Sequence, residues 1–304
     1  MAGMNRSTFP ADLQPGLNAH FGMAYREIPE EWRQVFEAGS SSKAFEEDVL
    51  EIGLGVAKRK GEGESVASDA GGQGWRARYQ HETWALSFSI TQEAIEDNLY
   101  DSLGPKYARS LARALKQAKE INAAAILNNA FDSNYVGGDG VALCSASHPL
   151  WAGGTFSNLL ETPADLSEAA LEDVLIKIRK AKDDRGLPIA LMAKQLVVPP
   201  EYNFTAIRLL QSNLRPGTAD NDINAIKSLG VFANQPATIT RLTDPDAWFV
   251  TTDCPEGLKL MQRTAVQRGT QEDFDTGSVK YKVRERYSVG WTNPRAIFGS
   301  AGAA

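Results

Sequence analysis

A long amphipathic stretch from Lys106 to Ala130 constrains the fold more than any other part of the sequence. Its apolar residues recur at every third or fourth position, the spacing of one face of an α-helix. They are Tyr107, Leu111, Leu115, Ala118, Ile121 and Ala125. The charged residues expected on the opposite face are Arg109, Arg113, Lys116, Lys119 and Glu120. Because about 25 helical residues span about 37 Å, the chain needs a fold built along one long helix. Gly104 and Pro105 are expected to end a shorter helix before it.

Length and composition place the chain among globular proteins. Its 304 residues are enough for one large domain or two moderate ones, and 23% charged with 42% hydrophobic residues is ordinary. The net charge of -6 argues against a protein that coats nucleic acid over most of its surface. We find no apolar stretch of about 20 residues for a membrane helix and no apolar core of a secretory signal. The sequence therefore predicts no membrane partner, with a cytoplasmic location as the default.

Two regions near the N-terminus lack the apolar residues for a core of their own. Residues 1–46 are rich in turn formers, apart from a helical piece from Glu30 to Glu37, and predict an arm that folds against something else. From Val49 to Arg78, short alternating segments flank a tip of Gly, Ser, Lys and Glu, which predicts a long two-stranded hairpin with a mobile end. Such a hairpin is hard to stabilise in an isolated monomer, so we expect it to lie on a neighbour.

The rest of the chain mixes helices and strands without regular βαβ alternation. The alternating residues of 84–90 predict a strand, and Thr91 can cap the helix that follows. Another helix is expected after Asp165 or Ser167, ending at Gly186 and Pro188. The remaining segments are a strand, a helix and then strands to the end: "KQLVVPP", "EYNFTAIRLLQS", "SLGVFANQPATITRL", "DAWFVTTD", "GLKLMQRT", "SVKYKVRERYSVGW" and "RAIF". These runs predict an α+β fold.

Cys144 and His148, in "LCSASHPLWAGGTFSNLL", raise the question of catalysis. A thiol needs a base nearby, but a pair four residues apart in a loop, without an orienting Asn or Asp pattern, is not how such dyads are assembled. A zinc site would need further ligands from isolated residues, which are His20, His81 and Cys254. We therefore predict no catalytic residue, no metal and no cofactor.

Two other polar groups also have ordinary explanations. The Gly-rich basic segment "GLGVAKRKGEG" lacks the spacing of a phosphate-binding loop and precedes no obvious helix. Asp183 and Asp184 lie beside Arg185 at a predicted helix end, where a solvated turn is expected. Neither group indicates an active site.

Four segments, taken in order, resemble the major capsid proteins of tailed double-stranded DNA bacteriophages, which have the Hong Kong 97-like fold. They are "WALSFSITQEAIEDNLYD", "SASHPLWAGGTFSNLLETPADLSEAALEDVLIKIRKAKDDRGLPI", "LVVPPEYNFTAIRLLQS" with "NDINAI", and "RERYSVGWTNPRAIFG". Their amino-acid sequences are similar to those of the branch that contains the Mu-like major head subunit. The resemblance covers most of the chain from Trp84 onward, and it rests on the order and spacing of the segments.

The resemblance implies a division of the chain. Residues 1–46 would be an N-terminal arm and 47–84 an extended loop that lies over an adjacent subunit. Residues 85–164 and 265–304 would form a peripheral domain along the long spine helix, and 165–264 an axial domain whose tips meet at fivefold and sixfold centres. Residues 143–160 would then be a surface connection in which Cys144 and His148 have no catalytic part.

The resemblance also implies function and partners. The chain would self-assemble, as pentamers and hexamers, into the icosahedral shell that encloses the phage double-stranded DNA genome. Its location would be the virion, after assembly in the host bacterial cytoplasm. Because the chain begins without a charge-rich helical segment, we expect a separate scaffolding protein, together with a portal and optionally a decoration protein. The alternatives are an encapsulin-like cellular compartment shell and, last, an enzyme using Cys144 and His148.

Contact residues follow from the same resemblance. Those expected at subunit interfaces are Lys58, Arg59, Lys60, Glu62, Glu64, Trp75 and Arg76. Arg109 and Arg113 on the spine helix would contact DNA or acidic neighbours, and the sequence does not choose between them. Some members of the wider family crosslink a lysine of the extended loop to an asparagine. Lys58 and Lys60 lie in that region, but no motif identifies the asparagine, so solvated or salt-bridged lysines are expected.

Overall fold

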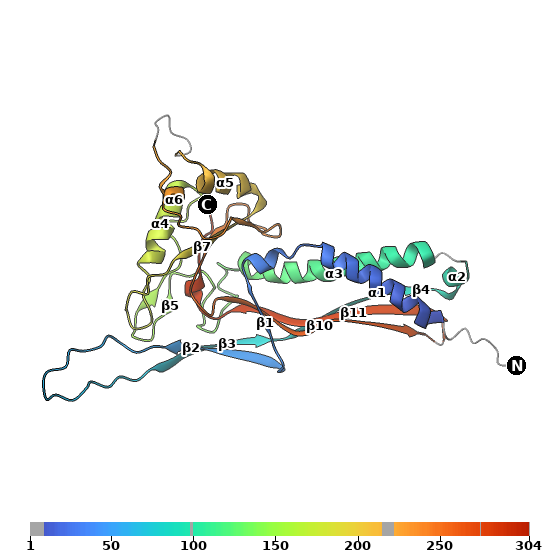
Figure 1. The fold of residues 1–304 in the computed structure, drawn as a ribbon, viewed down its shortest axis with the longest axis horizontal. Helices are drawn as coiled ribbons and strands as arrows, with labels where there is room; N and C mark the ends of the chain where they lie inside the picture. The colour runs from blue at the N-terminus through green and yellow to red at the C-terminus, as the bar shows by residue number, and fades with distance from the viewer. Residues whose placement is uncertain (1–8, 98–99, 215–221, 274, 304) are drawn as a thin grey trace.

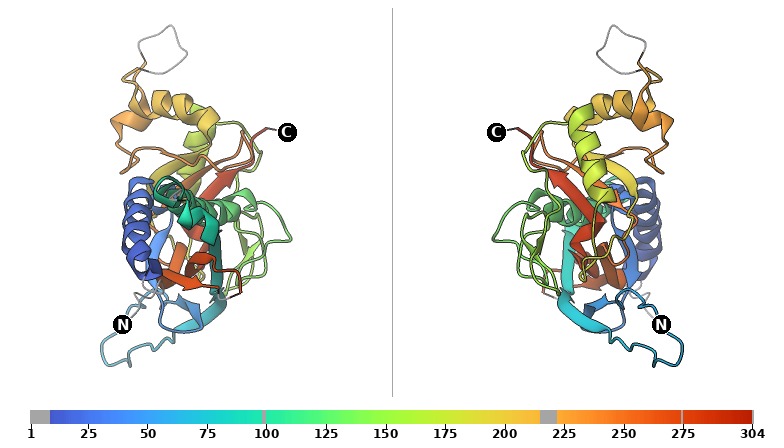
Figure 2. Two further views of the ribbon diagram at one scale, coloured as in Figure 1. Left: turned by 90° about the vertical axis from the view of Figure 1, so that its right-hand side faces the viewer. Right: turned by 90° about the vertical axis from the view of Figure 1, so that its left-hand side faces the viewer.

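The computed structural model of the chain describes residues 9–97, 100–214, 222–273 and 275–303. It has an elongated body, a compact part that stands above one end of it, and a hairpin that projects from the same end (Figure 1). The end views show the compact part above the body and the hairpin below it (Figure 2). The predicted mixture of helix and strand is confirmed.

A four-stranded sheet runs along the elongated body in the order β1-β10-β11-β4. β1 pairs with β10 in parallel, and the other pairs are antiparallel. The strands are β1 Glu37–Ser40, β4 Glu82–Ile90, β10 Leu258–Glu272 and β11 Val279–Trp291. Two helices, α1 Phe9–Glu27 and α3 Tyr100–Asn128, cover one face of this sheet. Ala108, Leu111 and Leu115 of α3 pack there with Tyr281 and Val283 of β11.

A second sheet forms the centre of the compact part, in the order β12-β9-β7-β8. Its strands are β7 Ala193–Val198, β8 Ala237–Thr238, β9 Trp248–Thr252 and β12 Ile297–Ser300. Three helices pack around it: α4 Glu168–Arg179, α5 Asn203–Gln211 and α6 Ala225–Ser228. Leu171, Val174 and Ile178 of α4 share a buried cluster with Leu196 and Trp248 of the strands. Short 3-10 helices and connecting elements complete the chain: η2 Glu31–Gln34, α2 Gln92–Glu96, β5 His148–Pro149, β6 Thr155–Phe156, η3 Pro200–Tyr202 and η4 Pro294–Ala296.

The hairpin consists of β2 Phe45–Ile52 and β3 Gly72–Gln80. Its ladder runs from the Phe45–Gln80 pair to the Ile52–Gly72 pair. Residues 53–71 form no strand, so the predicted hairpin is paired only at its base. The rest is a long exposed loop.

Several predicted helix limits were wrong. The turn-rich arm contains α1, in which Leu17, Phe21 and Ala24 are buried at helical spacing. Residues 1–8 of the arm lie outside the described part of the chain. α3 continues through Pro105 instead of starting there. α4 is capped by Ser167, which accepts the N–H of Ala170, and it ends at Arg179 rather than near Gly186.

The buried face of α3 also differs from the predicted stripe. Tyr107 and Ile121 are exposed, whereas Lys116, Lys119 and Glu120 are buried. The reason is α1 and the segment after it, which lie over the face that the sequence assigned to solvent. Buried charges on α3 therefore have partners from distant parts of the chain.

Each buried charge of α3 has a defined partner. The ammonium of Lys116 forms an ion pair with Glu30, and Lys119 Nζ lies 2.6 Å from Glu285 Oε2. The carboxylate of Glu120 accepts the backbone N–H groups of Glu31 at 2.9 Å and Trp32 at 3.1 Å. Glu120 thus satisfies the free N–H groups at the start of η2 from another helix.

The strand ladders cross the predicted domain limits. β10 begins at Leu258 and lies in the long sheet, although 165–264 is the predicted axial domain. β12 pairs with β9 in the compact sheet, although 265–304 is assigned to the peripheral domain. The division into domains stays a prediction.

Candidate assembly surfaces

The base of the hairpin is anchored to the end of the long sheet. Lys259 Nζ of β10 lies 2.6 Å from Asp48 Oδ2 of β2. Tyr79 Oη of β3 lies 2.6 Å from Thr292 Oγ1, and Trp75 Nε1 donates to the carbonyl oxygen of Thr292 at 3.2 Å. Although burial opposes the charge of Lys259, its hydrogen bonds with carboxylates raise its pKa. The loop therefore projects from a fixed base.

A glycine contact holds the other side of the base. Gly138, in the segment after α3, lies against the backbone of β3, so a Cβ at this position would be 2.5 Å from the carbonyl oxygen of Arg76. A side chain here would push β3 away, because a contact below 3 Å has no room to relax against backbone.

A second attachment joins the loop to the compact part. Arg185 Nη1 lies 2.8 Å from Asp69 Oδ2, and the same guanidinium donates to the carbonyl oxygen of Ala70. Asp69 Oδ2 also accepts the N–H of Gly55 at 2.7 Å, which ties the two legs of the loop together. The bonds from Gly55 and Arg185 hold the pKa of Asp69 below its usual range. We name this contact the loop latch.

The loop latch rests on a turn that the sequence assigned to solvent. Asp183 Oδ1 accepts the N–H groups of Arg185 and Leu187, both at 2.8 Å. Asp184 is buried, and its carboxylate lies 3.2 Å from the guanidinium of Arg295. The prediction of a solvated turn was wrong for Asp184, because Arg295 follows β11 and reaches this turn from a distant part of the chain.

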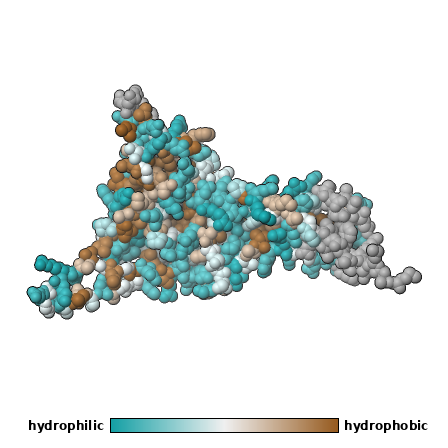
Figure 3. Space-filling view, in the orientation of Figure 1, coloured by the Kyte–Doolittle hydropathy of each residue, from teal (hydrophilic) through white to brown (hydrophobic). Residues whose placement is uncertain are grey.

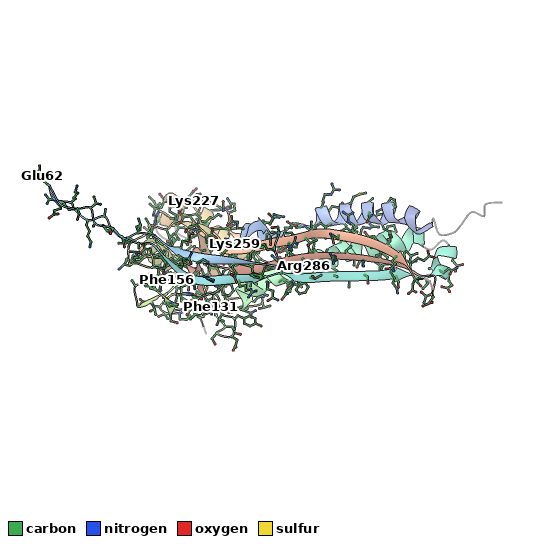
Figure 4. The ribbon with its side chains drawn as sticks, turned by 90° about the horizontal axis from the view of Figure 1, so that it is seen from below. Glu62, Phe131, Phe156, Lys227, Lys259 and Arg286 are labelled. Carbon is green, nitrogen blue, oxygen red and sulfur yellow. The ribbon has the colours of Figure 1, made fainter. Side chains whose placement is uncertain are left out.

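The structure separates the predicted contact residues into two groups. Six are exposed: Lys58, Arg59, Lys60, Glu62 and Glu64 on the loop, and Arg76 on β3. Glu62 marks the far end of the loop (Figure 4). Trp75 differs, because it is half-buried and bonded to its own chain. Arg109 and Arg113 are exposed on α3.

The compact part carries exposed apolar side chains that the sequence did not single out. Phe204 and Ile207 lie on α5, Ile223 precedes α6, and Leu229 follows it. The space-filling view shows apolar side chains gathered over this part of the molecule (Figure 3). Three of the four are more than 70% exposed: Phe204, Ile223 and Leu229. Exposed apolar residues that gather in one part of a surface are typical of surfaces that another molecule covers.

Cys144 and His148 do not form a catalytic pair. Burial raises the pKa of the Cys144 thiol far above its usual range. Burial also raises the pKa of the Cys254 thiol, to about 11. His148 lies 2.6 Å from Asp139 through Nδ1 and 3.1 Å from Asn158 through Nε2. Both ring nitrogens are therefore engaged, and neither is available as a base for Cys144.

Within residues 143–160, the buried side chains of His148 and Asn158 belong to a buried polar junction, whereas most of the segment is exposed or partly exposed. Asn158 is fully buried, and its Nδ2 faces the carbonyl oxygens of Leu143, Pro294 and Ile297 at 2.8–3.1 Å. Its Oδ1 accepts the N–H of Ser145 at 2.8 Å. The junction ties the chain after α3 to β12, and its buried polar groups have hydrogen-bond partners.

The described part of the chain has no group of three His, Cys, Asp or Glu that could hold a metal ion. No helix within that part is long and apolar enough to cross a membrane.

Comparison with known proteins identifies the family. A family model described as phage capsid protein matches residues 76–300, so the chain belongs to the phage capsid family. Among solved structures, the capsid of an empty GTA particle has a TM-score of 0.55 at 13% identity and covers 90% of both chains. The procapsid of bacteriophage JBD30 has a TM-score of 0.52 at 14% identity, covering 98% of this chain and 76% of that one. A virus-like particle from Pyrococcus furiosus has a TM-score of 0.55 at 11% identity, covering 94% and 98%.

These matches confirm the Hong Kong 97-like fold and a major capsid protein that builds shells. A search of curated protein sequences finds no match. The phage capsid family is a family of structural proteins.

Proposed function

We propose that the chain assembles into a closed icosahedral shell that encloses double-stranded DNA. The observation that carries this proposal is the unpaired part of the extended loop, residues 53–71, which is exposed over most of its length and held at its base and by the loop latch. Such a loop gains burial only against another molecule. Identical subunits that contact each other in this heterologous way close into rings or shells.

The contact residues have separate roles in this assembly. The loop cations and carboxylates, from Lys58 to Glu64, contact the adjacent subunit. The exposed apolar residues of the compact part, such as Phe204 and Leu229, meet their equivalents around fivefold and sixfold centres. Many weak contacts of both kinds sum to a stable shell.

The partners and location follow from this function. The shell is a virion component assembled in the host bacterial cytoplasm, with a separate scaffolding protein, a portal and optionally a decoration protein. An encapsulin-like compartment shell is the second candidate, since the virus-like particle from Pyrococcus furiosus has the same fold. Nucleic acid inside purified shells supports the capsid, whereas protein cargo without nucleic acid supports the compartment.

Shortening the loop tests the proposal. In the variant, a four-residue Gly-Ser linker replaces residues 56–67, which leaves the ladder and the loop latch intact. We expect the variant to unfold like the parent chain but to form no closed shells by electron microscopy after co-expression with scaffold. The matched control is Lys106→Ala on α3, which should assemble normally. Closed shells of parental size from the shortened chain would overturn the role of the loop.

A further inference from the structure

Two partly buried arginines, Arg263 of β10 and Arg286 of β11, have no partner among the described residues. The Nε atom of each is buried without a hydrogen-bond acceptor, and neither guanidinium forms an ion pair with a described carboxylate. Arg185 and Arg295 also have a buried nitrogen without an acceptor, but each of them forms an ion pair through another nitrogen. Since leaving a buried donor unpaired is costly, the first two arginines need an explanation.

The register of the long sheet places these two arginines next to each other. Arg286 pairs with Thr264, and β10 has a bulge before Thr264 in which Arg263 is the extra residue. Tyr287, the residue after Arg286, packs with residues of α3. Because side chains alternate along a strand, Arg286 points to the face opposite the helices, which Figure 4 views with Arg286 labelled.

His81, which joins β3 to β4, lies beside the two arginines. Its ring is 2.9 Å from Ser41 Oγ through Nε2 and 3.0 Å from Ser288 Oγ through Nδ1. Burial and the charges of Arg286 and Arg263 lower the pKa of His81. Both guanidinium groups therefore lie close to a buried imidazole that has a fixed position. We name Arg263 and Arg286 the arginine pair.

The carboxylates around the arginine pair are engaged elsewhere. Glu46 of β2 accepts the hydroxyl of Ser41 at 2.8 Å and lies 3.4 Å from Lys43 Nζ. Glu285 points to the helix-covered face of the sheet, where it pairs with Lys119. The positive charge of the arginine pair is therefore not neutralised within the described part of the chain.

The exposed cations of the chain do not share these properties. Lys106, Arg109 and Arg113 on α3, and residues 58–60 on the loop, are exposed, so water can satisfy their donors. The arginine pair instead has buried Nε atoms and side chains that start from two paired strands. A built site of this kind differs from a solvated group of surface charges.

We propose that Arg263 and Arg286 bind one oxyanion, either a carboxylate or a phosphate group, between their guanidinium groups. A guanidinium presents parallel N–H donors that match two oxygens of such a group. The bound oxyanion supplies acceptors for donors that the described chain leaves unpaired, and its charge offsets the repulsion between the two cations.

This chemistry has two sources, which are a free phosphate ion and a carboxylate of a second copy of the chain. The loop offers suitable carboxylates, because Glu62 and Glu64 are exposed and Glu62 marks its far end (Figure 4). The second source rests on the proposed function, since it requires two subunits in contact. The site itself can be tested in the unassembled chain.

The imidazole of His81 reports on the site. The chain is labelled with ¹³C-histidine, and NMR follows the titration of each histidine with and without about 20 mM inorganic phosphate at constant ionic strength. A bound phosphate offsets the charges that oppose protonation, so the proton affinity of His81 should rise about threefold. His20 and His148 should not respond.

Variants test whether the arginine pair causes this response. In Arg263→Gln with Arg286→Gln, phosphate should leave the proton affinity of His81 unchanged. The matched control, Arg179→Gln with Arg208→Gln, makes the same charge change on the compact part and should respond like the parent. A parent chain whose His81 ignores phosphate would overturn the proposal, and so would an equal response in the variant that lacks the arginine pair.

A second variant covers the case in which the glutamine variant does not fold. Arg263→Lys with Arg286→Lys keeps both charges but loses the forked donors. It should need about tenfold more phosphate for half of the His81 response. A half-response at the parental phosphate concentration would mean that charge alone acts on His81, which overturns the arginine pair as a shaped site.

Chemical labelling identifies the source of the oxyanion. Phenylglyoxal modifies accessible guanidinium groups, and peptide mass spectrometry measures the modification of Arg263 and Arg286. Phosphate should slow this modification severalfold in unassembled chains. In DNA-free shells without phosphate, protection that is lost in Glu62→Gln with Glu64→Gln supports a loop carboxylate of a second copy. Rapid modification that phosphate slows supports a free anion.

The remaining outcomes count against the site or its source. Modification that is the same with and without phosphate, in chains and in shells, would overturn the oxyanion site. Protection in shells that persists without Glu62 and Glu64 would overturn the loop carboxylates as the source. The proposed function fails separately, if the parent chain forms no shells, because the response of His81 to phosphate is measured before assembly.

Discussion

The buried ion pair between Lys119 and Glu285 allows a quantitative test of how α3 is held on the long sheet. Their side chains are 4% and 0% exposed, and their charged atoms are 2.6 Å apart. Lys119 Nζ also donates to Gln262 Oε1 at 3.1 Å. Oε1 of Glu285 has no hydrogen-bond partner among the described residues. Lys119 therefore provides most of the compensation for this buried carboxylate.

The substitution Lys119→Met removes the ammonium while keeping an unbranched apolar stem. Glu285 is then left as a buried charge without a counter-ion, and breaking a buried pair in this way destabilises a protein by about 3–5 kcal/mol. Adding Glu285→Gln removes the remaining charge. Since a neutral replacement of a buried ion pair is often neutral for stability, the double variant should recover at least half of the loss.

Urea unfolding of the unassembled chain, followed by tryptophan fluorescence, measures these free energies. The control is Arg113→Met on the exposed face of the same helix, which should change the free energy of unfolding by less than about 0.5 kcal/mol. A loss below about 1 kcal/mol for Lys119→Met would refute the reasoning. So would a double variant that loses as much as the two single variants together.

Three further predictions concern the polar contacts of the body and the loop. Because burial and nearby cations lower the pKa of His81, the unfolded chain binds more protons, and stability should fall as the pH drops below about 6.5. In His81→Gln, urea midpoints between pH 6.5 and 5 should fall less steeply than in the parent; equal slopes would contradict this. Asn158→Ala should destabilise the chain by about 2–4 kcal/mol, since it leaves several buried backbone groups unpaired; a urea midpoint like the parent's would contradict this. Arg185→Ala should speed tryptic cleavage at Lys58–Lys60 without changing the urea midpoint, while the control Arg179→Ala should change neither; unchanged cleavage would mean that the loop latch does not restrain the loop.

The sequence predicted those elements whose residues are positioned by local periodicity. β11 alternates buried and exposed residues from Val279 to Tyr287, and β9 is a continuous buried run. Thr91 accepts the N–H of Ala94, as its predicted cap role requires. In each case the signal lies within a few neighbouring residues. The same locality explains why the base of the hairpin was recognised.

The errors come from contacts between residues distant in sequence. The sequence places Lys119 on the solvent-facing side of α3, because the segments that bury it, α1 and β11, are distant in the sequence. Asn158 carries no pattern at all, although it joins three backbone carbonyl groups. The helix α1 could have been predicted from local periodicity, because Leu17, Phe21 and Ala24 have the spacing of a helix face. The turn formers Pro15 and Gly16 within it concealed that spacing.

The buried polar junction explains how a shell subunit can combine a fixed shape with a free loop. Asn158 and Arg295 link the chain after α3 and the turn at Asp184 to the segment that enters β12, so the compact part is bonded to the end of the long body. A polar junction holds one geometry, because any other leaves buried groups unpaired. The loop latch, in contrast, is exposed and rests on that same turn. The loop latch is made of a few contacts at the surface, one ion pair and two hydrogen bonds, so it restrains the loop less than the junction restrains the two sheets.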